Sequence, residues 1–137
     1  MIRVDAHHHL WDLSAIKYPW LNAQGVERFF GNPTPIHRNY LLDEFSTVAA
    51  AHGVGKSVHI QVGAADAWDA AQWVQSVADV DPQWPMVQVV FCDLTAPILA
   101  AQLDQFQTLS IVRCVRQIVG RAPGEDAQTG TNELLHS

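Results

Sequence analysis

The sequence predicts an α/β fold in which parallel strands alternate with helices. Three observations support this prediction. Four short apolar runs alternate with segments whose apolar residues recur at helical spacing. The runs are mostly apolar on both faces, as expected of a parallel sheet that helices cover. The first run leads directly into a cluster of histidines, and active-site groups commonly follow the carboxyl ends of parallel strands.

The first strand is expected over residues 2–7, and a long loop follows it. This loop runs from Leu10 to about Tyr40 and is rich in proline, glycine, asparagine and aromatic residues. Loops of this length within a compact domain are usually functional or cover a site. A helix is expected from Leu42 to His52, because its apolar residues have helical spacing and Gly53 stands where a helix would stop.

Strands and helices continue to alternate in the rest of the chain. Three further apolar runs predict strands, at residues 56–62, 86–94 and 110–119. A helix over residues 65–80 is expected to end before the break at Asp81 and Pro82. Thr95 is expected to cap a second helix that runs to about Phe106. Residues 120–137 read as a polar tail, in which residues 132–135 are expected to open another helix.

Composition excludes several classes of protein. The chain has 137 residues, of which 48% are hydrophobic and 16% charged, so it can bury the core of one domain. The net charge of -6, with dispersed acidic residues, argues against nucleic acid or an anionic membrane as the main partner. No apolar run approaches the length of a membrane span, and no secretory signal is evident. Cys92 and Cys114 lie in strand-like runs and are expected to be buried, reduced thiols, as in a cytosolic protein.

The run Asp5-Ala6-His7-His8-His9 is the strongest indication of a functional site. Because side chains alternate along a strand, His7 and His9 are expected to share one face with Asp5, while His8 points to the other. Two imidazoles placed in this way can hold one divalent metal ion, and zinc is the best match. Two alternatives are that the histidines are the remnant of a purification tag or serve only a structural role.

The position of this cluster also favours one architecture. The chain contains neither a Gly-x-Gly-x-x-Gly fingerprint after the first strand nor a phosphate-binding P-loop, so a dinucleotide or P-loop site is not expected. Metal-binding residues at the carboxyl end of the first strand instead indicate a (β/α)8 TIM barrel, whose active sites lie at that face. Such a barrel needs about 250 residues. We therefore expect about the first four βα units here.

The run from Val4 to Asp12 resembles the amidohydrolase superfamily. More narrowly, the chain is similar to predicted metal-dependent TIM-barrel hydrolases, the branch that includes sugar-lactone and pyrone-dicarboxylate lactonases. Four further segments resemble this branch in the same order: Tyr18–Leu21, His59–Gln61, Phe91–Leu94 and Val115–Val119. The resemblance implies that residues 1–137 are the amino-terminal part of a single hydrolase domain. It also implies that His7 and His9 belong to a metal or substrate site whose other ligands come from later strands.

Other residues are candidates because they follow predicted strands. Arg116 can bind a carboxylate or lactone oxygen in bidentate fashion, or it can be a buried structural arginine. Asp93 can orient a ligand or substrate, or cap the next helix. Gln61 can donate a hydrogen bond in the pocket. His59 shares the face of Gln61, and for His59 we favour a structural position inside the barrel. Relatives often have histidine where this chain has Gln117, so Gln117 is a candidate for substrate binding.

Two tryptophans complete the predicted site. The flat rings of Trp11 and Trp20 suit sugar-like substrates, although packing of the long loop explains them equally well. The resulting hypothesis is a metal-dependent hydrolase that acts on a small carbonyl ester, most naturally a lactone, with a divalent metal as cofactor. A related decarboxylase is one alternative. The other is a non-catalytic half-barrel, whose exposed sheet edge would lead it to self-associate or to bind a partner chain.

Overall fold

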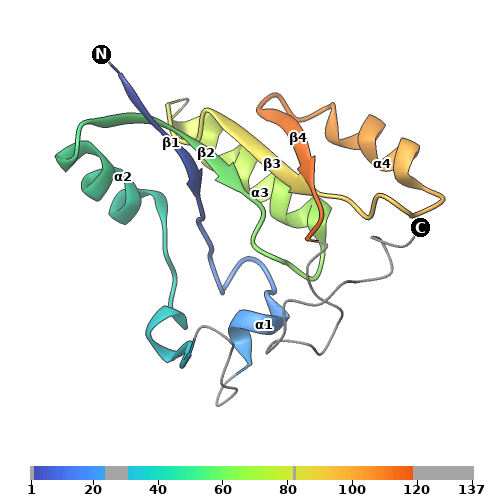
Figure 1. Ribbon diagram of the computed structural model, residues 1–137, viewed down its shortest axis with the longest axis horizontal. Helices are drawn as coiled ribbons and strands as arrows, with labels where there is room; N and C mark the ends of the chain where they lie inside the picture. Colours follow the sequence, from blue (N-terminus) through green and yellow to red (C-terminus); the bar gives the residue numbers. More distant parts are fainter. Residues whose placement is uncertain (1, 24–30, 82, 119–137) are drawn as a thin grey trace.

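In the computed structural model, which describes residues 2–23, 31–81 and 83–118, a four-stranded parallel sheet forms the centre of the fold (Figure 1). The strands are adjacent in chain order: β1 (Arg3–His8), β2 (Val54–Ile60), β3 (Val87–Phe91) and β4 (Val112–Arg116). The helices are α1 (Pro19–Asn22), α2 (Leu42–Ala51), α3 (Ala67–Val80) and α4 (Leu99–Phe106), with a short 3-10 helix at Thr34–Ile36. The predicted α/β fold with a parallel sheet is confirmed.

One face of the sheet is covered by the long helices, and it contains the core. Phe45 of α2 packs with Leu10 and Trp84, whereas Ala71 of α3 packs with Val90 of β3. Residues 71, 74 and 78 of α3 are buried at helical spacing, so this helix presents one apolar stripe to the sheet. We call the opposite side of the sheet the open face, because none of α2, α3 and α4 packs on it.

Strand pairing determines which side chains reach each face. His59 of β2 pairs with Gln88 of β3, and both are buried on the helix-covered face. An irregularity in register between Gln88 and Val89 shifts β4, so that Cys114 pairs with Val89 and Arg116 pairs with Phe91. Both β4 residues therefore lie on the open face.

The expectation that both cysteines are buried was wrong for Cys114. Both thiols are free, but only Cys92 is buried, and burial raises the pKa of the Cys92 thiol. Cys114 is exposed because it lies on the open face of a strand at the sheet edge.

The start of α4 also differs from the prediction. Thr95 does not cap this helix. Instead, both its backbone N–H and its hydroxyl donate to the Asp93 carboxylate, at 2.9 and 2.7 Å. The helix begins at Leu99, and Ile98 at its N-cap makes no side-chain capping bond. The predicted helix at residues 132–135 lies outside the described residues.

The long loop is more ordered than its composition suggested. It contains α1 and the 3-10 helix, and its two ends meet where Trp11 and Tyr40 exchange backbone hydrogen bonds of 3.0 and 2.9 Å. Ile16, Tyr18 and Leu21 form a small core of their own. Figure 1 shows α1 beyond the carboxyl ends of the strands, where the predicted site lies. Within the described ranges, no helix is long and apolar enough to cross a membrane.

Candidate metal and substrate site

The side chains of His7 and His9 converge at the carboxyl end of β1. Their Nε2 atoms lie 3.3 Å apart, and the rings meet edge to face with centroids 5.0 Å apart. The alternation of side chains along the strand explains why these two residues meet. The spacing predicts that Asp5 shares this face with the two histidines. In the structure, its carboxylate accepts a 2.9 Å hydrogen bond from the backbone N–H of His7.

His9 is held in one tautomer by the neighbouring strand. Its Nδ1 lies 2.9 Å from the carbonyl oxygen of Ile60. Because a carbonyl only accepts, Nδ1 carries the proton and Nε2 presents its lone pair toward His7. Burial is the main cause that lowers the pKa of His9; the bond to Ile60 opposes this shift, and the charges of His7 and Arg116 add to it. The ring is therefore neutral near pH 7.

This arrangement fits two ligands of a tetrahedral zinc ion. Nitrogen ligands about 2.1 Å from zinc, at a tetrahedral angle, are about 3.4 Å from each other. The separation of the Nε2 atoms is 3.3 Å. Ligand histidines usually donate their second ring N–H to a carbonyl or carboxylate, as His9 does. No group of three or more possible ligands occurs within residues 2–23, 31–81 and 83–118, so this part of the chain supplies a pair.

Behind this pair, on the helix-covered face, lies a second pair of histidines. The ring of His8 stacks on Phe45, with centroids 4.0 Å apart and an interplanar angle of 14°, and it meets His59 edge-on at 5.5 Å. Burial lowers the pKa of His8 to about 4 and that of His59 to about 3, so both rings are neutral near pH 7. The structure places His8 opposite His7 and His9, as predicted.

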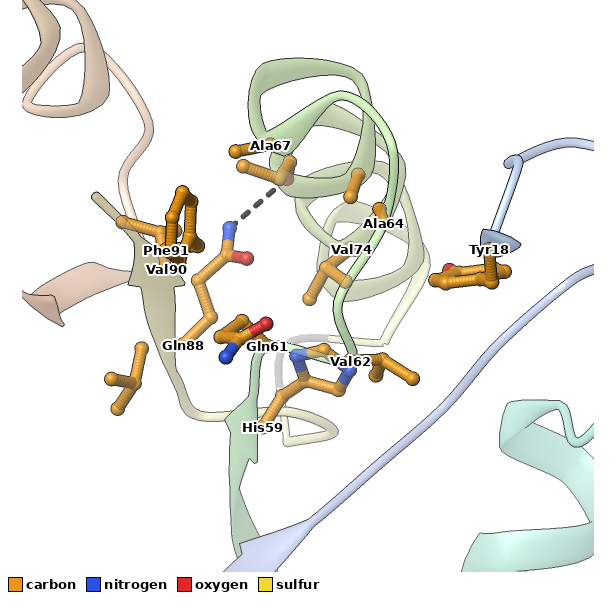
Figure 2. A pocket seen from close by; sticks show the side chains of 13 residues that line it. Tyr18, His59, Gln61, Val62, Ala64, Ala67, Val74, Gln88, Val90 and Phe91 are labelled. Carbon is orange, nitrogen blue, oxygen red and sulfur yellow. Dashed lines mark hydrogen bonds between the residues drawn. The ribbon is translucent and has the colours of Figure 1, made fainter. Parts of the chain in front are cut away.

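His59 and Gln61 lie elsewhere than expected. Instead of facing the inside of a barrel, they line a small cavity of about 30 Å³ between the sheet and α3, which Figure 2 shows from close by. Gln88 crosses this cavity to donate a 3.0 Å hydrogen bond to the carbonyl of Ala71. The side-chain oxygen of Gln61 accepts a 2.7 Å bond from the N–H of Gly63, so its amide turns back on its own loop.

Arg116 is the predicted residue that shares the open face with the histidine pair. It ends β4. Burial is the main cause that lowers the pKa of His9, and the charge of Arg116 adds a smaller contribution to this lowering. Asp93 and Gln117 instead join the ends of β3 and β4. The Gln117 oxygen accepts a 2.8 Å bond from the N–H of Leu94, and its nitrogen donates to Asp93 at 3.4 Å. The hydroxyl and N–H of Thr95 are the main cause of the lowered pKa of Asp93.

Both predicted tryptophans are anchored through their indole N–H groups. Trp11 donates to the carbonyl of Arg38 and Trp20 to that of Val62, each at 2.6 Å. The Trp20 bond ties the long loop to the chain just after β2, whereas the Trp11 bond joins the two ends of the loop to each other.

Two residues, His59 and Gly63, shape this region although the sequence does not predict a positioning role for them. His59 is a polar residue between the apolar residues Val58 and Ile60, and that contrast is the signal that marks it. Gly63 has a positive φ of 76° and lies against Trp20, a close approach that the isolated glycine in the sequence only hints at.

Two curated proteins and one solved structure resemble this chain. No family model matches the chain. An uncharacterized protein, y4mH of Sinorhizobium fredii, is 34% identical over 116 residues, which are 83% of this chain and 39% of the relative. An L-fucono-1,5-lactonase of Burkholderia multivorans is 29% identical over 107 residues, which are 77% of this chain and 32% of the relative.

A solved structure establishes the fold. The crystal structure of an amidohydrolase from Burkholderia multivorans, with HEPES bound, superposes with a TM-score of 0.65 and 24% identity, over 89% of this chain and 38% of that one. The chain therefore has the fold of part of that TIM barrel. The predicted fold, the first part of a TIM barrel, is thereby confirmed for the part of the chain that the structure describes. The chain spans less than two fifths of the length of the curated relatives it matches.

Proposed function

We propose that this chain supplies part of the active site of a metal-dependent hydrolase, in which His7 and His9 hold a divalent metal ion. The observation that carries this proposal is the convergence of the two Nε2 atoms at 3.3 Å, with the second ring nitrogen of His9 bound to the Ile60 carbonyl. Zinc is the metal we propose, because neutral imidazole suits it and the spacing fits tetrahedral ligation. When bound, such an ion polarises a carbonyl or lowers the pKa of a water molecule.

The substrate we propose is a small carbonyl ester, in particular a lactone. The similarity to an L-fucono-1,5-lactonase supports this choice. Arg116 lies on the same face as His7 and His9, where its guanidinium would anchor a carboxylate or lactone oxygen. The chain's own contribution is thus to keep His9 neutral and oriented, and to set a positive charge beside it.

Metal titration of the purified chain tests the ligand assignment. We expect zinc to bind to the wild-type chain, and His7→Ala and His9→Ala each to reduce its affinity at least tenfold, because each leaves a single imidazole. His52→Ala is the matched control, because this exposed histidine lies at the end of α2. Zinc affinity that is equal in all four proteins would refute the assignment.

Hydrolysis of L-fucono-1,5-lactone, followed as acid release at constant pH, tests the substrate class. The full chain should exceed the spontaneous rate, and His9→Ala should return to it. Arg116→Gln should raise KM if the guanidinium binds substrate oxygen. A rate that does not change in His9→Ala would show that this histidine has no part in the reaction.

A further inference from the structure

Two hydrogen bonds from imidazole to carbonyl cross between the ends of β1 and β2 in opposite directions. From β1, His9 Nδ1 donates to the carbonyl of Ile60 at 2.9 Å. From β2, His59 Nε2 lies 3.4 Å from the carbonyl oxygen of Leu10. Because that oxygen only accepts, the proton of His59 is on Nε2. The two strand ends are therefore tied to each other by reciprocal side-chain contacts.

The backbone of His9 needs such support. Pairing between β1 and β2 ends at His8, which is opposite His59, so His9 and Leu10 lie beyond the ladder. Moreover, the register of β1 is irregular between Asp5 and His8. The chain after His9 is held by Leu10, whose side chain is fully buried and whose carbonyl accepts from His59.

We propose that His59 is a positioning residue for His9. Its Nε2–H donates to the Leu10 carbonyl and so fixes the position of the backbone at His9. From this position, His9 Nδ1 contacts the Ile60 carbonyl and His9 Nε2 contacts His7 Nε2. Groups that orient a metal ligand commonly change metal affinity by about 10- to 100-fold when they are removed. The proposal rests on the proposed function only in taking His9 to be a metal ligand.

Packing alone does not explain an imidazole at position 59. The side chain is 3% exposed, and its Nδ1 has no hydrogen-bond partner among the described residues. Figure 2 shows the ring beside Gln61 and Val62, in a cavity whose α3 side is lined by alanine and valine. An apolar side chain of similar size would fill this space and would remove the unpaired Nδ1, but it would leave the Leu10 carbonyl without this donor. The Nε2–H bond to Leu10 is the feature that such a residue cannot reproduce.

The test compares two variants of similar shape in the full 137-residue chain. His59→Gln keeps an N–H donor at about the reach of Nε2, whereas His59→Met fills the same length without a donor. We expect His59→Met to weaken zinc binding about tenfold in calorimetric titration, and His59→Gln to stay within about twofold of wild type. Ser57→Ala is the control, because it removes a buried hydroxyl of β2 that has no hydrogen-bond partner among the described residues.

A second measurement does not depend on the metal. Nitrogen-15 spectra of the imidazoles in the metal-free protein report the tautomer of His9. We expect the Nδ1–H form in wild type and in His59→Gln, and a mixture of tautomers in His59→Met. If wild type binds no zinc, the metal site of the proposed function fails, yet the spectra still decide the role of His59.

Two results would overturn the positioning role. One is a His59→Met protein that keeps both wild-type zinc affinity and the Nδ1–H form of His9. The other is a folded His59→Gln protein that loses the Nδ1–H form as fully as His59→Met does. If His59→Met does not fold, His59→Leu provides the same comparison.

Discussion

Substitution of Gly63 tests whether the end of β2 and the long loop are fitted to each other. Gly63 has a φ of 76°, and a Cβ atom there would lie 3.2 Å from Nε1 and 3.3 Å from Cδ1 of Trp20. The Trp20 ring cannot move away freely, because its N–H donates to the Val62 carbonyl at 2.6 Å. Gly63→Ala therefore introduces both backbone strain and a steric conflict.

The expected magnitude follows from these two contributions. The left-handed conformation costs an alanine roughly 1 kcal/mol relative to glycine. Displacing Trp20 weakens a hydrogen bond whose net contribution is about 1 kcal/mol. We expect Gly63→Ala to lower the free energy of unfolding by about 2 kcal/mol in total.

Gly53→Ala separates the two contributions. Gly53 has a φ of 71°, almost the same as Gly63, but its nearest neighbour to a new Cβ would be Arg3 Nη1 at an ordinary 3.8 Å. We expect this control to cost about 1 kcal/mol in urea unfolding followed by circular dichroism. The excess of Gly63→Ala should disappear in a Trp20→Ala background. Equal costs for the two glycines, or an excess that persists without the indole, would refute the argument.

Three further predictions concern single contacts and association. Asp66→Ala should lower the free energy of unfolding by about 1 kcal/mol in the same assay, because the Asp66 carboxylate caps α3 by accepting hydrogen bonds from two backbone N–H groups. Asp66→Asn should recover most of this loss. Glu44 forms a 2.6 Å ion pair with Arg38, but both side chains are about half exposed. Glu44→Gln should therefore leave the unfolding midpoint unchanged, and a clear shift of the midpoint would contradict this. Self-association stays a prediction, and sedimentation should give a mass above that of one chain. Phe91→Lys on the open face, where Phe91 is 39% exposed, should reduce this mass, whereas Val48→Lys on α2 should not. A monomer at all concentrations would rule self-association out.

Local periodicity predicted the elements of the fold well. The four strands and the three long helices were expected near their observed positions, because burial on both faces of a parallel strand and on one stripe of a helix is visible in the sequence. The boundaries near Thr95 were wrong, because a local turn to Asp93 competes with helix capping for the same hydroxyl and N–H groups.

The candidate site was predictable only in part. The two-residue period of a strand placed His7 and His9 on one face, and the structure brings their Nε2 atoms together. The position of Gln61 at the end of a predicted strand suggested a place in the substrate pocket. Its side-chain oxygen instead accepts a hydrogen bond from the N–H of Gly63, and a bond between near neighbours in a turn has no signature in strand periodicity. The exposure of Cys114 follows from a register shift between β3 and β4, which depends on the pairing partner.

The sequence by itself determined the parallel α/β fold and the facing of the histidine pair, because both depend on spacing within single elements. Only the tertiary structure decided the 3.3 Å approach of the two imidazoles, the proton on Nδ1 of His9 and the contact between His59 and the Leu10 carbonyl. These features depend on the register of β1 against β2, which joins residues about fifty positions apart. Such register is fixed by the burial of one face of the sheet and by the pairing partner, so it is not visible within a single element.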